Sequence, residues 1–175
     1  MGKLIFITGG SRSGKSSLAV KLAQSSRKDK VFVATCVPID KEMKERVALH
    51  KKNRPSSWKT IEESRALASL LRKEAASRAL IIIDCLTLFV SSLMMKGRGE
   101  DEIKKEVAEI TAAVKNGKSD VIIVSNEVGC GLVPESKLGR RFRDIAGSVN
   151  QIVASRADEV IYMISGLPLI LKREK

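Results

Sequence analysis

A glycine-rich segment between an apolar run and a helical stretch constrains the fold of this chain more than any other feature. Residues 9–16 read GGSRSGKS, which fits the spacing G-x-x-x-x-G-K-S. The apolar run KLIFIT (3–8) before it predicts a buried strand, and residues 15–26 after it predict a helix. The two glycines allow a tight wrap in which backbone N–H groups point inward at phosphate oxygens. The positive end of the following helix dipole meets the same anion.

Two side chains complete this predicted phosphate loop. Lys15 can reach the β- and γ-phosphates of a nucleotide, and the Ser16 hydroxyl can occupy a magnesium site. The alternative is a glycine turn that matches by chance, but the position between a strand and a helix favours phosphate binding. The predicted phosphate contacts are Gly9, Gly10, Ser11, Arg12, Ser13, Gly14, Lys15 and Ser16. The loop alone does not distinguish a kinase from an ATPase or a GTPase.

Short β-branched runs alternate with helical stretches along the chain, a pattern typical of a parallel sheet covered by helices. The strands are expected at 3–8, 31–35, 58–62, 79–84, 120–126, 159–165 and 167–172. The helices are expected at 15–26, 41–52, 64–76, 86–96, 101–115 and 136–156. We predict a single α/β domain over residues 1–175, P-loop NTPase-like, with a mostly parallel central sheet flanked by helices. An antiparallel arrangement is open for the last strand.

Apolar residues at helical spacing predict which side of each helix faces the core. These stripes are Leu18, Ala19 and Leu22; Leu67, Leu70 and Leu71; and Ile103, Val107, Ile110 and Val114.

The composition bounds the partners and the location of the protein. Hydrophobic residues make up 43% of the chain, and none of the apolar runs approaches the roughly 18–20 residues that span a bilayer. We therefore expect a chain without a membrane anchor, a signal peptide or a lipid attachment site. Cys36, Cys85 and Cys130 are odd in number and far apart in the sequence. This pattern argues against a disulfide framework or a zinc site and predicts a reducing, cytoplasmic location.

The formal net charge of +12 favours polyanionic partners, with nucleic acid as one candidate. The basic residues are scattered, and they are not interleaved with the stacking aromatics that a single-strand-binding surface needs. We therefore expect a solvated basic surface and no nucleic-acid partner.

An acid ends the most convincing central strand, ALIIID (79–84). If the sheet is parallel, Asp84 lies at the carboxyl edge, where ligands of open α/β folds bind. It then contacts a nucleotide or holds magnesium through water. The alternative is a helix cap for residues 86–96.

His50 is the single histidine of the chain, and it shares a stripe with Met43 and Val47 on the predicted helix 41–52. A half-buried structural histidine is the ordinary interpretation of such a position. A catalytic one is favoured by the basic cluster of Lys51, Lys52 and Arg54, which can hold several phosphates. A neutral imidazole is also a competent nucleophile toward phosphorus.

Several segments together resemble a known family, the bifunctional adenosylcobinamide kinase and adenosylcobinamide-phosphate guanylyltransferase of cobalamin biosynthesis. The segments are ITGGSRSGKSSLA (7–19), VFVAT (31–35), RVALHKKNRPSSWKTIE (46–62), IIIDCLT (81–87) and VSNEVGCGLVPESKLGRRFRDIAGSVNQIVASRADEVIYMISGLPL (124–169). The resemblance implies a kinase step in which ATP or GTP phosphorylates adenosylcobinamide. It also implies transfer of GMP from GTP to adenosylcobinamide phosphate through a GMP-histidine intermediate, with release of pyrophosphate.

The resemblance also implies roles for individual residues. His50 matches the family's nucleophile. The implied GTP contacts are Gly9 to Ser16, Ala34, Thr35, Cys36, Lys51, Lys52, Asn53, Arg54, Glu62 and Asp84. Some relatives carry two adjacent histidines, whereas Leu49 precedes His50 here, and some have glutamate at the position of Asp84. The cofactor implied is Mg²⁺, and the assembly implied is a homo-oligomer, a trimer.

Two further groups follow the strand 120–126. Asn126 and Glu127 lie at the ligand edge if the sheet is parallel. Arg140 and Asp144 are spaced i, i+4 on the next helix, so a surface ion pair is one interpretation. Contact of the arginine group Arg140, Arg141 and Arg143 with phosphates or the corrinoid is the other.

Two other function classes remain open at this point. A simple P-loop small-molecule kinase would share Lys15 and Ser16 but would not use His50 as a nucleophile. A P-loop nucleic-acid-binding module would exploit the net charge and would show a steep salt dependence of affinity.

Overall fold

The computed structural model describes residues 2–36, 41, 45, 55, 57–74 and 77–174. Its strands are β1 (Leu4–Gly9), β2 (Lys30–Ala34), β3 (Lys59–Glu62), β4 (Leu80–Asp84), β5 (Asp120–Val124), β6 (Glu159–Ile164) and β7 (Leu167–Arg173). Its helices are α1 (Lys15–Gln24), α3 (Leu67–Glu74), α4 (Leu86–Met95), α5 (Glu100–Asn116) and α6 (Lys137–Arg156). The predicted alternation of strands and helices is therefore confirmed in these ranges.

The seven strands form one sheet in the order β3-β2-β4-β5-β1-β6-β7. All neighbours pair parallel except β6 and β7, which form an antiparallel hairpin at the edge. The predicted fold class is confirmed, including the antiparallel last strand. Strands β2 to β5 lie on one side of β1, and β6 and β7 lie on the other. The order in which strands are added to the sheet therefore switches sides at β1. Ligands of open α/β sheets bind at such switch points.

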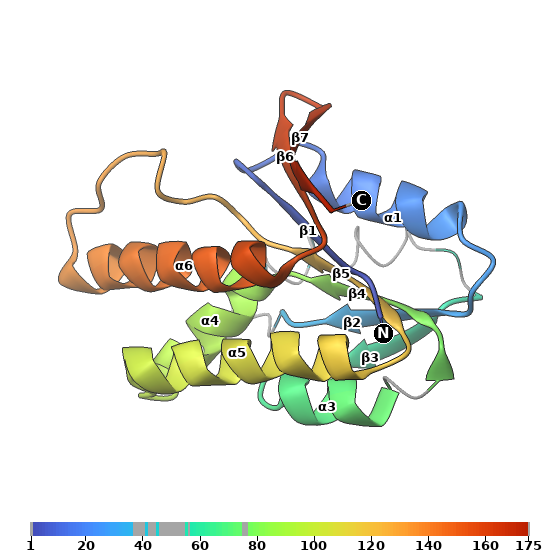
Figure 1. Cartoon of the computed structure of the whole chain (residues 1–175). Coiled ribbons are helices and arrows are strands. Elements are labelled where there is room, and N and C mark those ends of the chain that lie inside the picture. The colour runs from blue at the N-terminus through green and yellow to red at the C-terminus, as the bar shows by residue number, and fades with distance from the viewer. Residues whose placement is uncertain are drawn as a thin grey trace.

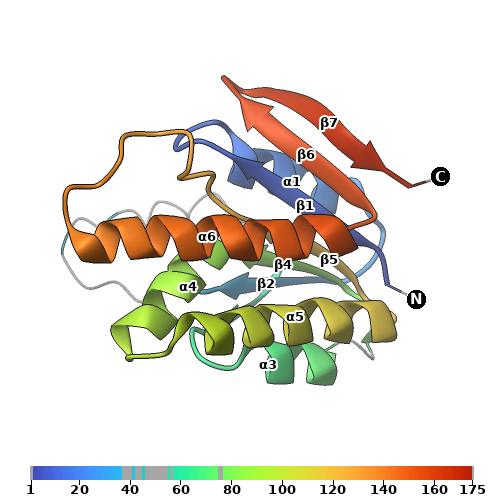
Figure 2. The ribbon, with the colours of Figure 1, turned by 60° about the vertical axis from the view of Figure 1, so that its left-hand side comes forward.

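Helices cover both faces of the sheet (Figures 1 and 2). One face carries α3, α4, α5 and α6, and its core includes Phe6, Ile83, Phe89 and Val149. Of the helices that the structure describes, α1 alone packs on the opposite face. The two clusters are apolar and fully enclosed, as expected for a parallel sheet that is buried on both sides.

The stripe predicted on α5 is correct, since Ile103, Val107, Ile110 and Val114 are all buried. On α1, the fully buried apolar residues are Ala19 and Ala23. Leu18 and Leu22 lie at the margin and pack against the core only in part. Small side chains at the centre of the contact let α1 approach the sheet closely.

The start of α3 differs from the sequence prediction of 64–76, because the helix begins only at Leu67. The Glu63 carboxylate accepts hydrogen bonds from the backbone N–H groups of Arg65 (2.6 Å) and Ala66 (3.1 Å). Because the Glu63 side chain binds these N–H groups, residues 64 and 65 form a bend and the helix begins after them.

The predicted helix 41–52 falls mostly outside the described residues. Lys41 and Glu45 are described and helical, whereas His50 and its proposed inward position are outside the described part. Within that part, none of the helices is both long and apolar enough to cross a membrane.

The core assignment predicts a large loss of stability on truncation of Phe89, which is fully buried in α4. Phe89→Ala should lower the free energy of unfolding by about 3–5 kcal/mol, because the cavity left behind cannot fully collapse. Met95→Ala in the same helix is the control, since Met95 is 68% exposed, and it should change stability by less than about 0.5 kcal/mol. Urea unfolding followed by circular dichroism measures both, and equal losses would contradict the assignment.

Candidate active site

The phosphate loop runs from the end of β1 to the start of α1, and its glycines hold positions that other residues do not tolerate. Gly9 has a φ of 143°, and a Cβ there would lie 2.2 Å from the Met163 carbonyl oxygen. The backbone of β6 therefore approaches β1 so closely that only glycine fits. Gly14, with a φ of 94°, precedes α1 and allows the turn into the helix.

Lys15 is the first residue of α1 and points back into this loop. Its ammonium group donates to the Gly10 carbonyl oxygen at 2.5 Å and to the Ser13 hydroxyl at 3.4 Å. Burial lowers the pKa of Lys15 below its ordinary value, and the nearby Asp84 carboxylate opposes this effect. Lys15 is thus a desolvated cation that gains from an anionic partner. Ser16, the next residue, is half-buried.

Three residues predicted as nucleotide contacts lie side by side at the carboxyl edge. Ala34 on β2 pairs with Glu62 on β3 and with Asp84 on β4. The sheet therefore brings together the ends of three strands that are far apart in the sequence. Glu62 is exposed, whereas Asp84 is half-buried.

Thr35 and Cys36 continue from β2 along the same edge. The Thr35 hydroxyl donates to the Cys85 carbonyl oxygen at 2.7 Å, which fixes the turn after β2 against the turn after β4. Burial raises the pKa of the Cys36 thiol, and the Asp84 carboxylate raises it further. Cys85, rather than Asp84, occupies the N-cap position of α4. The geometry therefore gives no support to the interpretation of Asp84 as the helix cap.

The predicted nucleophile and basic cluster are not part of this description. His50, Lys51, Lys52, Asn53 and Arg54 lie outside the described residues.

A hydrogen-bond network that was not predicted from the sequence holds the turn after β5 beside the phosphate loop. Asn150 of α6 is 7% exposed, shares a hydrogen bond of 2.7 Å with the Ser125 hydroxyl, and donates to the Asn126 carbonyl oxygen at 3.1 Å. The Asn126 N–H donates to the Thr87 hydroxyl at 3.0 Å. We call Thr87, Ser125, Asn126 and Asn150 the Asn150 clamp. The sequence feature that could have predicted this network is Asn150, a polar residue between the apolar residues Val149 and Val153 of α6.

The clamp leads directly into the phosphate loop, because the N–H of Glu127 donates to the Gly9 carbonyl oxygen at 2.9 Å. Asn126 and Glu127 therefore lie at the ligand edge, as the sequence predicts for a parallel sheet.

Arg140 does not form the surface ion pair with Asp144 that was one of the two interpretations of their spacing. Its guanidinium instead donates to the carbonyl oxygens of Pro134 (3.1 Å) and Glu135 (2.5 Å). These bonds tie the loop that precedes α6 to the first turn of that helix, and they engage the Arg140 guanidinium.

The donor set fits magnesium bound through phosphates. Among the described residues, three or more His, Cys, Asp or Glu side chains do not gather into a metal site. Mg²⁺ keeps several waters and needs only one or two protein oxygens when phosphates supply others. The Ser16 hydroxyl and the Asp84 carboxylate are oxygen donors of the required kind.

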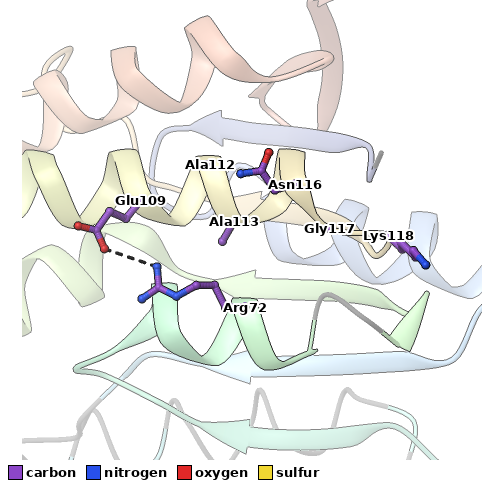
Figure 3. Close-up of a pocket in the computed structure, with 7 residues that line it drawn as sticks. All are labelled: Arg72, Glu109, Ala112, Ala113, Asn116, Gly117 and Lys118. Atoms are coloured by element: carbon purple, nitrogen blue, oxygen red, sulfur yellow. Dashed lines mark ion pairs between the residues drawn. The ribbon is translucent and has the colours of Figure 1, made fainter.

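A cavity of about 390 Å³ lies elsewhere, between α3 and α5 (Figure 3). Its lining includes the residues just before β5, at the amino edge of the sheet, and an ion pair of 3.6 Å between Arg72 and Glu109. It shares none of its lining residues with the predicted site, so we do not assign the active site to it.

Comparison with known proteins identifies the family. Residues 5–171 match the sequence profile of the family described as cobinamide kinase / cobinamide phosphate guanyltransferase. The chain belongs to this family. A bifunctional adenosylcobalamin biosynthesis protein, CobP, from Pseudomonas aeruginosa is 39% identical over 168 residues, which is 96% of each chain. The bifunctional protein CobU from Salmonella typhimurium is 38% identical over 97% of this chain and 99% of its own.

Solved structures support the P-loop NTPase fold of this family member. A KaiC-like protein, PH0186, from Pyrococcus horikoshii has a TM-score of 0.58 at 16% identity, covering 99% of this chain and 80% of its own. An ATPase from a bacterial type III secretion system has a TM-score of 0.56 at 16% identity, covering 94% and 52%. At this identity the likeness concerns the fold alone.

The geometry of Lys15 predicts a specific loss of nucleotide binding on its removal. Lys15→Ala should weaken the Kd for a nucleoside triphosphate by at least about tenfold, because a charge-assisted contact to phosphate is lost. Lys21→Ala, at an exposed position of the same helix, is the control and should leave the Kd unchanged. Isothermal titration with GTP measures both, and an unaltered Kd in the first variant would contradict the role of the loop.

The environment of Cys85 predicts an inert thiol. Burial, together with the charge of Asp84, raises its pKa to about 11, so at pH 8 the thiol stays protonated and does not attack alkylating reagents. Iodoacetamide should therefore modify the exposed Cys130 first and Cys85 only on unfolding. Peptide mass spectrometry over time measures the order, with Cys130→Ser as the control. If Cys85 were labelled as fast as Cys130, its thiol would be accessible to solvent, which would contradict its burial.

Proposed function

We propose that this protein phosphorylates adenosylcobinamide with ATP or GTP and then transfers GMP from GTP to adenosylcobinamide phosphate. The products of the second step are adenosylcobinamide-GDP and pyrophosphate. The full-length match to the bifunctional family carries this proposal. The buried Lys15 at the mouth of a phosphate loop supports it independently.

In the kinase step, the hydroxyl oxygen of adenosylcobinamide attacks the γ-phosphorus, the hydroxyl proton is released to solvent, and the bond to the leaving nucleoside diphosphate breaks. Backbone N–H groups of the phosphate loop bind the phosphate oxygens, and Lys15 stabilises the charge that develops between the β- and γ-phosphates. Ser16 and Asp84 would hold Mg²⁺, which supplies further neutralisation of the phosphate charge. The proposed nucleotide contacts are Gly9 to Ser16, Ala34 to Cys36, Lys51 to Arg54, Glu62 and Asp84.

In the second step, we assign the nucleophile to His50. An imidazole nitrogen attacks the α-phosphorus of GTP, pyrophosphate leaves, and a phosphoramidate bond forms. An oxygen of the acceptor phosphate then attacks the same phosphorus, and the P–N bond breaks to restore the imidazole. A neutral imidazole is required for the attack, so the step depends on deprotonated His50.

We also propose a cytoplasmic homo-oligomer, a trimer by analogy with the family. The edge strand β7 supports a self-association surface, because it exposes Leu167, Leu169, Ile170 and Leu171 together. An exposed apolar edge strand of this kind invites pairing or burial. The three cysteines are free in the structure, which accords with a reducing compartment.

The test of the proposal is covalent labelling. Incubation with GTP labelled at the α-phosphate should leave acid-labile, base-stable label on the protein, and peptide mapping should place it on His50. His50→Ala should lose both the label and guanylyl transfer, because no other histidine is present to replace it. The same variant should keep kinase activity, since γ-phosphate transfer depends on Lys15, and this activity serves as its control for folding.

Two results would contradict the assignment. Label retained in His50→Ala would exclude this histidine as the nucleophile. A wild-type protein that phosphorylates a small alcohol but takes up no guanylyl label would be a simple P-loop kinase.

A further inference from the structure

Arg143 carries a buried guanidinium nitrogen with an unmet hydrogen-bonding requirement. Among the residues that the structure describes, two buried side-chain polar atoms have no hydrogen-bond partner, the Arg143 Nη1 and the Thr8 Oγ1. A buried donor without an acceptor costs free energy, more so when it belongs to a charged group. Native proteins rarely tolerate this unless a ligand or a water completes the site.

The position of Arg143 on α6 places it toward the ligand edge. Arg143 precedes Asn150 by seven residues, so two helical turns put both on the same side of α6. Asn150 binds Ser125 and Asn126 at the carboxyl end of β5. Arg143 is about 10 Å nearer the N-terminus of α6, beyond the strand ends.

The second buried atom without a hydrogen-bond partner in the described part of the chain, the Thr8 hydroxyl oxygen, lies on the same side of the sheet as α6. Thr8 precedes Gly9 at the end of β1, and its alternation with Leu4 and Phe6 turns it toward the face that α6 covers. Thr8 is 7% exposed. Both unpartnered atoms therefore belong to the α6 side of the carboxyl edge.

The other arginines of α6 are already accounted for. Arg140 holds the Pro134–Glu135 backbone, and Arg156 donates to the Ala108 carbonyl oxygen and the Thr111 hydroxyl at 3.0 Å each. Arg141 is exposed to solvent. Arg143 is half-buried, and it is the arginine of this helix whose guanidinium has a buried nitrogen without a hydrogen-bond partner among the described residues, which points to an anionic ligand.

The face of the sheet on which Arg143 lies indicates which of the two substrates supplies the anion. The phosphate loop passes into α1, which packs on the opposite face from α6. A nucleotide held by the loop and α1 would leave the α6 side of the carboxyl edge for the other substrate.

We propose that Arg143 binds the phosphate monoester of the acceptor in the guanylyl-transfer step. This inference rests on the proposed function, in which the group that accepts in the first step is a neutral hydroxyl and the group that accepts in the second is the phosphate placed on it. A guanidinium fork matches two phosphate oxygens at once, whereas an alcohol offers it no charge. Arg143 therefore favours the phosphorylated acceptor over the unphosphorylated one.

The test compares the affinities of three ligands by isothermal titration. Arg143→Ala should weaken the Kd for adenosylcobinamide phosphate by about 10- to 100-fold, the range for loss of a charged hydrogen bond. The Kd values for adenosylcobinamide and for GTP should stay within about twofold, well below the tenfold that 1.4 kcal/mol represents. Arg141→Ala, two residues away and exposed, should change none of the three. Arg143→Lys keeps the charge and should give an intermediate loss, and it replaces Arg143→Ala as the test if the alanine variant does not fold.

Several outcomes would overturn the inference. Equal weakening of the phosphorylated and unphosphorylated acceptors would make Arg143 a residue of the corrinoid surface, and a loss confined to GTP would make it a nucleotide contact. Wild-type protein that binds both acceptors with equal affinity would refute the role of Arg143 while leaving the proposed function intact. Wild-type protein that binds neither acceptor would refute the proposed function together with the inference.

Discussion

The parallel pairing of β1 between β5 and β6 is the constraint on which the site depends. Gly9 ends β1 opposite Met163, and the close approach of the two backbones excludes any side chain there. The Gly9 carbonyl oxygen also accepts the N–H of Glu127 from the other neighbouring strand end. Together these contacts fix the start of the phosphate loop between β6 and the turn after β5.

The polar groups at this edge fall into two kinds. The Asn150 clamp is buried and satisfied, and such a network stiffens the turn after β5 because its members partner one another. Lys15 and Arg143 are cations whose burial is only partly compensated by the protein. A satisfied network positions the backbone, whereas under-satisfied cations gain from phosphate. The edge thus separates residues that support the site from the residues that we propose meet the substrates.

Features set by short-range order could be predicted from the sequence. The phosphate loop depends on glycines and a lysine at fixed spacing, and the buried stripe of α5 depends on apolar residues at helical spacing. Both follow from backbone geometry over a few residues. The start of α3 could not be predicted, because the Glu63 side chain competes for the N–H groups that would begin the helix earlier.

The sequence by itself determined the order of the described strands and helices, the phosphate loop and the buried stripe of α5, since each is encoded by residues that are neighbours in the chain. Only the tertiary structure decided that β5 lies between β1 and β4, and that Asn150 reaches Asn126 across 24 residues. It also decided that Arg140 binds the backbone while Arg143 keeps a buried, unpartnered nitrogen. These outcomes depend on strand order and on the path of α6. The physical reason is that burial and pairing of a polar group are set by what packs against it, and those partners come from distant parts of the chain.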